Sequence, residues 1–270
     1  PNTSLPRQRF RTIRAKHIIL ASGALERHIA FNNNDIPGVM SVNASRHYLN
    51  RYGVLTGKNI VITTNNDSVY QTAIELHEAG SKVTVLDSRK NINIDLPKEI
   101  ELHLETLPFS INGRKKIESL DVCKASDKTN KYTIICDQVL VSGGWSPIVN
   151  LVSHRGIKPV WNEENLCFVP GEIKENITVV GSARGIWNND DCIKSGIVGA
   201  NEAMNNLGIQ KKEIAFPSIG GWSNPIDALY EVKSNKFPSK SFIDFQHDVT
   251  AEDVRLAHRE GFVSVEHLKR

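Results

Sequence analysis

The sequence has little of what marks several common classes of protein. It contains no apolar run close to the roughly 18 residues that a transmembrane helix needs, so a membrane protein is not expected. Its 33 basic and 30 acidic residues leave a net charge of only +3, which gives no electrostatic footprint for nucleic acid. The 4 cysteines form no CxxC pair, and this argues against a redox dithiol or a cysteine-rich metal site.

The start of the sequence also lacks two features of a complete or exported chain. It has no initiator methionine and no charged segment followed by an apolar one, as a signal peptide would have. We interpret the chain as an internal piece of a longer polypeptide, or as a processed or partial gene product. Buried thiols in a reducing cytoplasm are the default for its cysteines. With 40% hydrophobic residues over 270 positions, we expect a globular protein of one large domain or two.

Two buried strands are expected to end in turns of small residues. The first lies within residues 13–27 and the second within residues 176–180, and a predicted helix at residues 188–206 follows the second. Such turns are typical of parallel strands whose ends are approached closely by another group. The turn residues are Ala21, Ser22 and Gly23 after the first strand, and Gly181, Ser182, Ala183 and Arg184 after the second. We expect both strands in one parallel sheet.

Between them lies a β-α-β unit, predicted as a strand at residues 59–64, a helix at residues 68–79 and a strand at residues 82–87. In a dinucleotide-binding fold the first turn of such a unit carries glycines, which let the backbone approach a pyrophosphate. Here that turn has no glycine, and Asp67 places negative charge where a phosphate would lie. Asp87 stands where a ribose-binding acid would. We nevertheless interpret the turn as structural and as having lost tight dinucleotide binding.

The remaining segments have simpler patterns. Residues 101–142 alternate in the manner of antiparallel strands, and residues 207–240 contain the prolines and glycines of a polar linker: Pro217, Gly220, Gly221 and Pro225. Near the C-terminus, Thr250 is placed to cap a helix that has Asp253 at its third position. Parallel strands with crossover helices indicate an α/β protein.

Several motifs resemble those of known families. ILASGALER resembles the ATG motif of two-dinucleotide-domain flavoproteins, VSGGWSP their second strand-end signature, and VVGSARG their late Gly-Asp motif. More closely, TTNNDSVYQTA, LVSGGWSPIVNL and FIDFQHDVTAEDVRLAHREGFVSVEHLKR are similar to the alpha subunits of heterotetrameric sarcosine oxidases. The resemblance covers nearly the whole chain, and the C-terminal motif is its most specific part.

The resemblance implies an FAD/NAD(P)-binding two-dinucleotide-domain fold, in which a parallel sheet with crossover helices is joined by a β-meander and followed by a small helical segment. Residues 1–56 and 148–206 would be parts of the first dinucleotide-binding domain, and residues 57–147 an inserted second dinucleotide-like domain. Residues 207–240 would be the linker, and residues 241–270 would begin a small helical domain resembling the sarcosine oxidase A3 domain.

The resemblance also implies an activity. Enzymes of this family are oxidoreductases acting on CH–NH donors, and they oxidise sarcosine to glycine with O2, giving H2O2 and 5,10-methylenetetrahydrofolate. The alpha subunit binds NAD and carries a tetrahydrofolate domain further along its chain. FAD lies in the beta subunit, FMN lies near the alpha–beta interface, and gamma and delta subunits complete the heterotetramer. The chain would then be the NAD-binding portion of a cytoplasmic enzyme, with no catalytic residue for amine oxidation.

The residues that would line the NAD are those of the two small-residue turns. Ala21, Ser22 and Gly23 would line the first dinucleotide domain, and Gly181, Ser182, Ala183 and Arg184 would close it from the other side. Ser182 stands where the wider flavoprotein class has Asp, so a carboxylate-to-ribityl hydrogen bond is not available. Arg184 would suit a phosphate or a carboxylate. This departure fits a subunit whose dinucleotide is not a working FAD.

Two further sets of residues invite a functional role. The charged triplet Glu26, Arg27 and His28 could contact a cofactor phosphate or ribose, or could lie in a solvated loop. At residues 244–248, related subunits begin a domain with cysteines that bind an iron–sulfur cluster, but here the stretch has no thiolate, so we expect no cluster. The nearby histidines do not have the spacing that would put three metal ligands on one face, and we expect no metal.

Two other functions stay open. An autonomous NADH-dependent flavoprotein is disfavoured by the missing CxxC pair and by the glycine-free turn. A non-catalytic scaffold subunit of another amine-oxidising flavoenzyme, of the opine, proline or dimethylglycine type, is favoured by Asp67 and disfavoured by the two small-residue turns. Because the substrate is selected on another subunit, this chain does not decide between amines.

Overall fold

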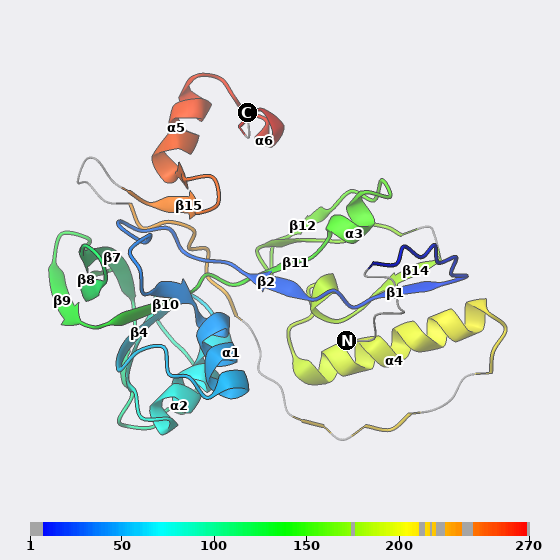
Figure 1. Ribbon diagram of the computed structural model, residues 1–270, viewed down its shortest axis with the longest axis horizontal. Coiled ribbons are helices and arrows are strands. Elements are labelled where there is room, and N and C mark those ends of the chain that lie inside the picture. The colour runs from blue at the N-terminus through cyan, green and yellow to red at the C-terminus, as the bar shows by residue number, and fades with distance from the viewer. Residues whose placement is uncertain are drawn as a thin grey trace. The chain divides into compact units, whose positions relative to one another are not determined.

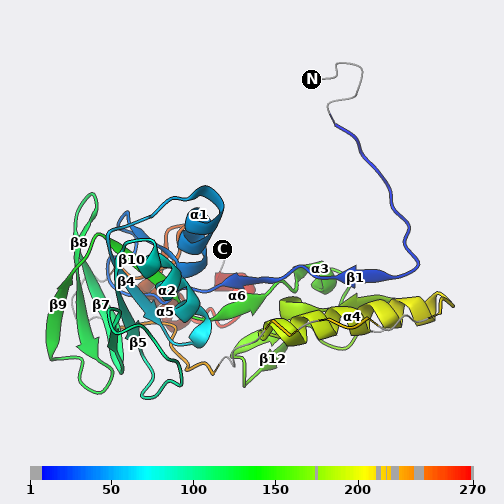
Figure 2. The ribbon, with the colours of Figure 1, turned by 90° about the horizontal axis from the view of Figure 1, so that it is seen from below.

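The structure is a computed structural model, drawn as a ribbon in Figures 1 and 2. It describes residues 8–173, 176–210, 214–216, 218–219, 225–233 and 240–268. The predicted linker residues Pro217, Gly220 and Gly221 lie outside the described residues. Two compact units share the chain. Unit 1 consists of Pro1–Gly23, Pro147–Val160 and Phe168–Gly221, and unit 2 of Ala24–Ser146, Trp161–Cys167 and Trp222–Arg270.

A five-stranded, wholly parallel sheet forms the centre of unit 2. In spatial order its strands are β3 (Val39–Ser41), β10 (Gln138–Ser142), β4 (Asn59–Thr64), β5 (Lys82–Asp87) and β6 (Glu101–His103). In β4 and β5 every residue after the first is buried, because both faces of a parallel sheet are covered. The strands predicted at residues 59–64 and 82–87 are therefore confirmed at both ends.

Helices cover one face of this sheet. Helix α1 (Val42–Tyr52) and helix α2 (Tyr70–Glu78), which follows the short 3₁₀ helix η1 (Asp67–Val69), lie side by side in Figure 1. Their apolar residues pack on Ile60, Ile62 and Val85 of the sheet. Helix α1 ends at Gly53, whose φ of 65° is left-handed and favours glycine.

An antiparallel sheet covers the opposite face. It is formed by β7 (Thr106–Gly113), β8 (Ile117–Lys124) and β9 (Lys131–Ile135), in that order. Ile111 and Leu120 are fully buried and belong to the same core cluster as Val61 and Val139 of the parallel sheet. The expected β-meander thus spans residues 106–135, whereas residues 101–103 and 138–142, expected to belong to it, lie in the parallel sheet.

The boundary between the two units differs from the prediction, which placed all of residues 1–56 in the first dinucleotide domain. In the structure residues 24–56 are part of unit 2. The physical reason is that β3 hydrogen bonds in parallel with β10, with Val39 opposite Val139, so the edge strand and helix α1 after it are held by the second sheet.

The part of unit 1 that positions the predicted site is small. Strand β1 (Ile18–Leu20) pairs in parallel with β14 (Ile177–Val179), with Ile18 opposite Ile177, so the expectation of one parallel sheet is confirmed. Beside these strands lies helix α4 (Asn189–Asn206), which Asn188 caps (Figures 1 and 2). Gly199 lets the helix approach closely, because a Cβ there would lie 2.6 Å from Val180 Cγ1.

The remaining elements are short. They are β2 (Ala24–Glu26), which pairs with β11 (Trp145–Pro147); α3 (Asn150–Ser153); the β12 (Val160–Asn162) and β13 (Cys167–Val169) pair; and the 3₁₀ helix η2 (Gly181–Arg184). Near the C-terminus come β15 (Phe242–Asp244), β16 (Val249–Thr250), α5 (Ala251–Arg259) and α6 (Val265–Leu268). Helix α5 begins with the capping box that Thr250 and Asp253 predict. No helix in the described part of the chain has the length and apolarity to cross a membrane.

Candidate functional site

The two small-residue turns lie next to each other in unit 1. Since β1 and β14 are parallel neighbours in register, their carboxyl ends meet at one edge, and the backbone N–H of Val180 donates to the carbonyl oxygen of Leu20 at 3.0 Å. A Cβ added to Gly23 would lie 4.0 Å from Ser182 Oγ. The structure therefore places the first turn next to the start of the second, so that a side chain at position 23 would contact Ser182.

The backbone of both turns is left-handed and is held by the protein itself. Gly23 has a φ of 79° and Gly181 a φ of 64°, conformations that side chains other than glycine strain to adopt. The Gly23 carbonyl accepts a hydrogen bond from Ile148 N at 3.0 Å, and Gly181 N donates to Ser195 Oγ at 3.2 Å. These bonds hold the backbone of both turns without a ligand.

The predicted residues differ in what their side chains can do. Ala183 is fully buried and packs with Val152 and Val179, so only its backbone could meet a ligand. The Ser22 hydroxyl donates to the Ile148 carbonyl at 3.3 Å. Ser182 is half-buried, whereas Ala21 and Arg184 are exposed.

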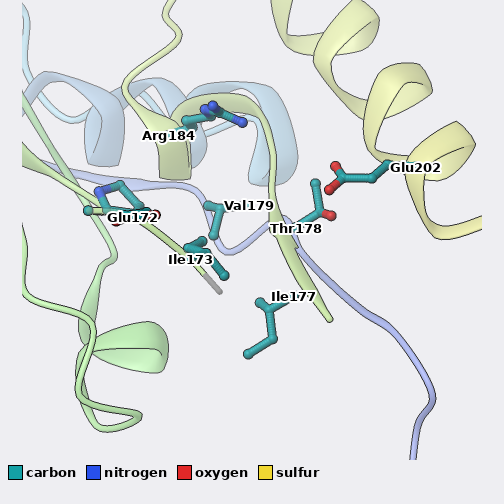
Figure 3. A pocket seen from close by; sticks show the side chains of 9 residues that line it. Glu172, Ile173, Ile177, Thr178, Val179, Arg184 and Glu202 are labelled. Carbon is teal, nitrogen blue, oxygen red and sulfur yellow. The ribbon is translucent and has the colours of Figure 1, made fainter. Parts of the chain in front are cut away.

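A cavity of about 310 Å³ lies beside β14 in unit 1, and Arg184 lines it together with Thr178, Glu172 and Glu202. Figure 3 shows Glu202 reaching from α4 toward Thr178, with Arg184 away from them at the far side. Two carboxylates and only one guanidinium line this cavity, which disfavours an anion inside it. The gap between the turns, where there is no carboxylate side chain among the seven predicted residues, suits a phosphate-bearing ligand better.

Small residues at the ends of adjacent parallel strands fit the ribose-phosphate part of a dinucleotide. A glycine without Cβ allows close approach, and the Ser182 hydroxyl can donate to an oxygen without adding negative charge. An Asp at position 182 would instead accept from sugar hydroxyls. The residues present therefore fit a dinucleotide, and no carboxylate among these seven residues could hold a flavin ribityl chain.

The glycine-free turn of unit 2 is filled by the chain's own side chains. Asn66 Oδ1 accepts from Ser68 N at 3.1 Å, and Asp67 forms an ion pair with Arg89 at 2.7 Å. Asp87, predicted as a ribose-type acid, is fully buried and accepts hydrogen bonds from Arg89. Burial lowers the pKa of Arg89, but its bonds to Asp87 raise that pKa overall, so the guanidinium stays charged.

Comparison with known proteins identifies the relatives of the chain. It is 36% identical over 275 residues to the sarcosine oxidase alpha subunit of Rhizobium meliloti (strain 1021), a match that covers 100% of this chain and 27% of that protein. It is 32% identical over 285 residues to the sarcosine oxidase alpha subunit of Corynebacterium sp. (strain U-96), covering 98% and 29%. The chain is homologous to sarcosine oxidase alpha subunits. It spans about a quarter of the length of these relatives.

Two other matches add a domain family and a second kind of oxidase subunit to the proteins that the chain resembles. The family model described as the sarcosine oxidase A3 domain matches residues 238–270. An opine oxidase subunit of Rhizobium meliloti is 26% identical over 230 residues, a match that covers 74% of this chain and 43% of that protein. The resemblance read from the C-terminal motif is confirmed.

Solved structures confirm the predicted fold class. L-proline dehydrogenase from P. horikoshii has a TM-score of 0.64 at 19% identity, covering 95% of this chain and 48% of that one. Lactococcus lactis thioredoxin reductase has a TM-score of 0.56 at 20% identity, covering 72% and 66%. The fold is that of FAD/NAD(P)-binding oxidoreductases.

Two of the motifs singled out in the sequence have packing explanations in unit 2. After ILASG, the Glu26 carboxylate accepts from Asn43 N at 2.8 Å, burial lowers the pKa of Arg27, and the His28 ring lies 4.8 Å from that of Phe245. In VSGGWSP, a Cβ at Gly143 would lie 2.9 Å from the His28 carbonyl oxygen. Glu26 and Arg27 are therefore half-buried in unit 2, and His28 is exposed but packs on Phe245.

Sequence reasoning missed Arg89, whose signal was its position two residues after the strand-end acid Asp87. The spacing allows the arginine to fold back onto that acid, with bonds of 3.0 Å from Nε to Oδ1 and 2.7 Å from Nη2 to Oδ2. Among the residues described, no group of three or more His, Cys, Asp and Glu is arranged to hold a metal ion. His247 pairs instead with Asp244 at 2.9 Å.

Proposed function

We propose that the chain is the NAD-binding portion of an alpha subunit of a sarcosine-oxidase-type enzyme, and that NAD lies at the two turns of unit 1. The observation that carries this proposal is the approach of Gly23 to Ser182 at the shared end of two parallel strands. Ala21, Ser22, Gly23, Gly181, Ser182, Ala183 and Arg184 are the residues assigned to it. Ala183 would contribute its backbone only, and Arg184 would offer charge to a phosphate at the edge.

The activity proposed for the assembled enzyme is the oxidation of sarcosine to glycine by O2, with H2O2 and 5,10-methylenetetrahydrofolate as products. Identities of 36% and 32% to sarcosine oxidase alpha subunits support it. The partners would be beta, gamma and delta subunits in the cytoplasm. FAD would lie in the beta subunit, FMN at the alpha–beta interface, and tetrahydrofolate in a separate domain of the alpha subunit. This chain would bind NAD, and the amine would be oxidised elsewhere.

Bound NAD would supply a nicotinamide ring able to accept hydride. The contribution of this chain is to hold the dinucleotide. The left-handed glycines keep side chains out of the gap, and the Ser182 hydroxyl and backbone amides can bind oxygen atoms of the sugar-phosphate chain.

A second candidate is the corresponding subunit of an opine-oxidising enzyme. The match to the opine oxidase subunit favours it, although at 26% identity. Oxygen uptake by the assembled enzyme distinguishes the two: rapid uptake with sarcosine and none with an opine supports the first, and the reverse supports the second. A proline or dimethylglycine substrate would give neither result.

The test of the NAD site is a titration of NAD into the complete alpha subunit with its partner subunits. Gly23→Ala places a methyl group in the gap, 4.0 Å from Ser182 Oγ, and should weaken NAD binding by about tenfold or more, or about 1.4 kcal/mol. Gly156→Ala is the matched control, because Gly156 also lies in unit 1 with a positive φ of 86° but has nothing within 4 Å of an added Cβ. Equal losses in both variants would contradict the assignment.

Arg184 is tested in the same titration. Arg184→Ala should weaken NAD binding several-fold, whereas Arg114→Ala, which removes an exposed arginine from the turn between β7 and β8, should leave it unchanged. An unchanged affinity in Arg184→Ala would remove Arg184 from the site but leave the two turns in it.

A further inference from the structure

Unit 2 has the edge at which an open parallel sheet holds a nucleotide, namely the carboxyl ends of β4, β5 and β10. Their last residues are Thr64, Asp87 and Ser142, and all three side chains are buried. In a nucleotide-binding unit this edge would be open to a ligand. Here all three of these side chains have a hydrogen-bond partner within the chain.

The first partner is the guanidinium of Arg89, which is 5% exposed and lies between two acids. It bonds Asp87, which is 0% exposed, and pairs with Asp67 at 2.7 Å. The Tyr70 hydroxyl donates to Asp87 Oδ2 at 2.6 Å. One cation between two carboxylates leaves the buried cluster with an excess of negative charge, which opposes a phosphate. Both carboxylate oxygens of Asp87 already accept hydrogen bonds from Arg89 or Tyr70. Neither oxygen is therefore free for a ribose hydroxyl.

The second partner is the asparagine pair of the turn. Asn66 is fully buried, and its Nδ2 lies 3.3 Å from the Ser142 carbonyl oxygen, so its side chain bridges the ends of β4 and β10. Its Oδ1 accepts from the Ser68 amide, one of the N–H groups that a phosphate would otherwise use. The place of the anion at the start of the helix is therefore taken by a neutral amide.

The third partner is residues 225–233, which we call the strap. Arg89 Nη1 donates to the Pro225 carbonyl at 2.8 Å, and Asn65 Nδ2 donates to the Asp227 carbonyl at 2.6 Å. The Asp227 amide returns a bond to the Asn65 carbonyl at 3.1 Å. The strap thus binds directly to the turn and to Arg89.

The strap continues into the segment that matches the A3 domain. Val232 is fully buried, and its amide donates to the Ala30 carbonyl at 2.8 Å. Glu231 forms an ion pair with Arg255 of helix α5. Beyond residues 234–239, Phe242 exchanges two hydrogen bonds of 2.8 Å with the side chain of Asn34. These contacts tie the start of the helical segment to the rest of unit 2.

We propose that the nucleotide edge of unit 2 binds no nucleotide and serves instead as the docking surface for the strap, with Arg89 in the place of the ligand. The edge carries no function in cofactor binding and anchors the A3-matching segment. This inference rests on the proposed function, because it confines NAD to unit 1. The exchange of the strap amides tests it without reference to NAD.

The experiment uses the complete alpha subunit with its partner subunits and has two readouts. Equilibrium dialysis with NAD counts bound equivalents in the wild type, in Gly23→Ala and in Arg89→Gln. Hydrogen–deuterium exchange measures the amides of the strap in Arg89→Gln and in Arg46→Gln, the matched control that breaks the exposed Arg46–Glu75 pair on α1 and α2.

We expect one equivalent of NAD, weakened by Gly23→Ala and kept by Arg89→Gln, and strap exchange at least tenfold faster in Arg89→Gln only. If Arg89→Gln does not fold, Asn65→Ala removes one strap bond and should speed strap exchange several-fold. A second equivalent of NAD, or binding lost in the Arg89 variant and kept in Gly23→Ala, would overturn the inference. Unchanged strap exchange in both Arg89→Gln and Asn65→Ala would also overturn the inference. No bound NAD with accelerated strap exchange would overturn the proposed function and uphold this inference.

Discussion

Replacing Arg89 by methionine tests the most consequential contact of unit 2. Methionine is of similar length and apolar, so Arg89→Met keeps much of the volume and removes only the charge and the donors. The change leaves Asp87, which has no exposed surface, without its bidentate partner, and it removes the ion pair to Asp67. It also frees the Pro225 carbonyl from its 2.8 Å bond.

The magnitude follows from burial. Removing one partner of a buried pair costs about 3–5 kcal/mol, because the remaining charge is left without compensation. The control Arg46→Met breaks the pair with Glu75, in which the arginine side chain is 44% exposed, and should cost about 0–1 kcal/mol. At roughly 2–4 °C per kcal/mol for a unit of this size, Arg89→Met should lower the melting temperature by about 6–20 °C.

The assay is urea and thermal unfolding of the wild type, the two single variants and the double variant Arg89→Met/Asp87→Asn. Neutralising Asp87 removes the uncompensated charge, so the double variant should recover part of the loss, and the coupling between the two sites should exceed about 1 kcal/mol. A loss in Arg89→Met as small as that in Arg46→Met, or additive effects in the double variant, would refute the view that Arg89 replaces a ligand at this edge.

Three further predictions concern stability and reactivity. Gly144→Ala should destabilise the protein more than Gly53→Ala, because an added Cβ would lie 2.4 Å from Ile226 Cδ1 at the first site and within 4 Å of nothing at the second, although φ is positive at both; equal melting temperatures would contradict this. Thr250→Ala should cost about 1 kcal/mol and speed amide exchange in α5, and unchanged exchange there would count against the capping box. Burial raises the pKa of Cys136 to about 12, because the folded state favours the neutral thiol. The contribution of this thiol to the stability of the folded state is complete below the ordinary thiol pKa of roughly 8.5 and is lost as pH rises toward 12. Iodoacetamide at pH 8 should therefore label Cys136 only after unfolding, and rapid labelling of the folded protein would disprove the shift.

The elements predicted best were those whose signal is local. The runs at residues 59–64 and 82–87 are apolar because both faces of their sheet are covered, and such runs identify buried parallel strands. The cap at Thr250 depends on residues within one helical turn. The pairing of the two small-residue turns was also accessible, since strands of this kind end at a common edge.

What sequence reasoning missed depends on contacts far apart in the chain. Strand β3 has three residues, too few for a recognisable run, and it is defined by pairing with β10 about a hundred positions later. That pairing moved residues 24–56 into unit 2. The role of Arg89 depends on Asp67 and on the Pro225 carbonyl, and a backbone acceptor 136 residues away leaves no trace in a sequence pattern.

The most direct test of the central claim is hydrogen–deuterium exchange of the complete alpha subunit with and without NAD. The account predicts slower exchange of the amides at residues 21–23 and 181–184 when NAD is bound, and no change at residues 63–70. Protection confined to residues 63–70 would contradict it and return the nucleotide to unit 2. Absence of any NAD-dependent protection would remove the nucleotide from both units and favour a scaffold role for the chain.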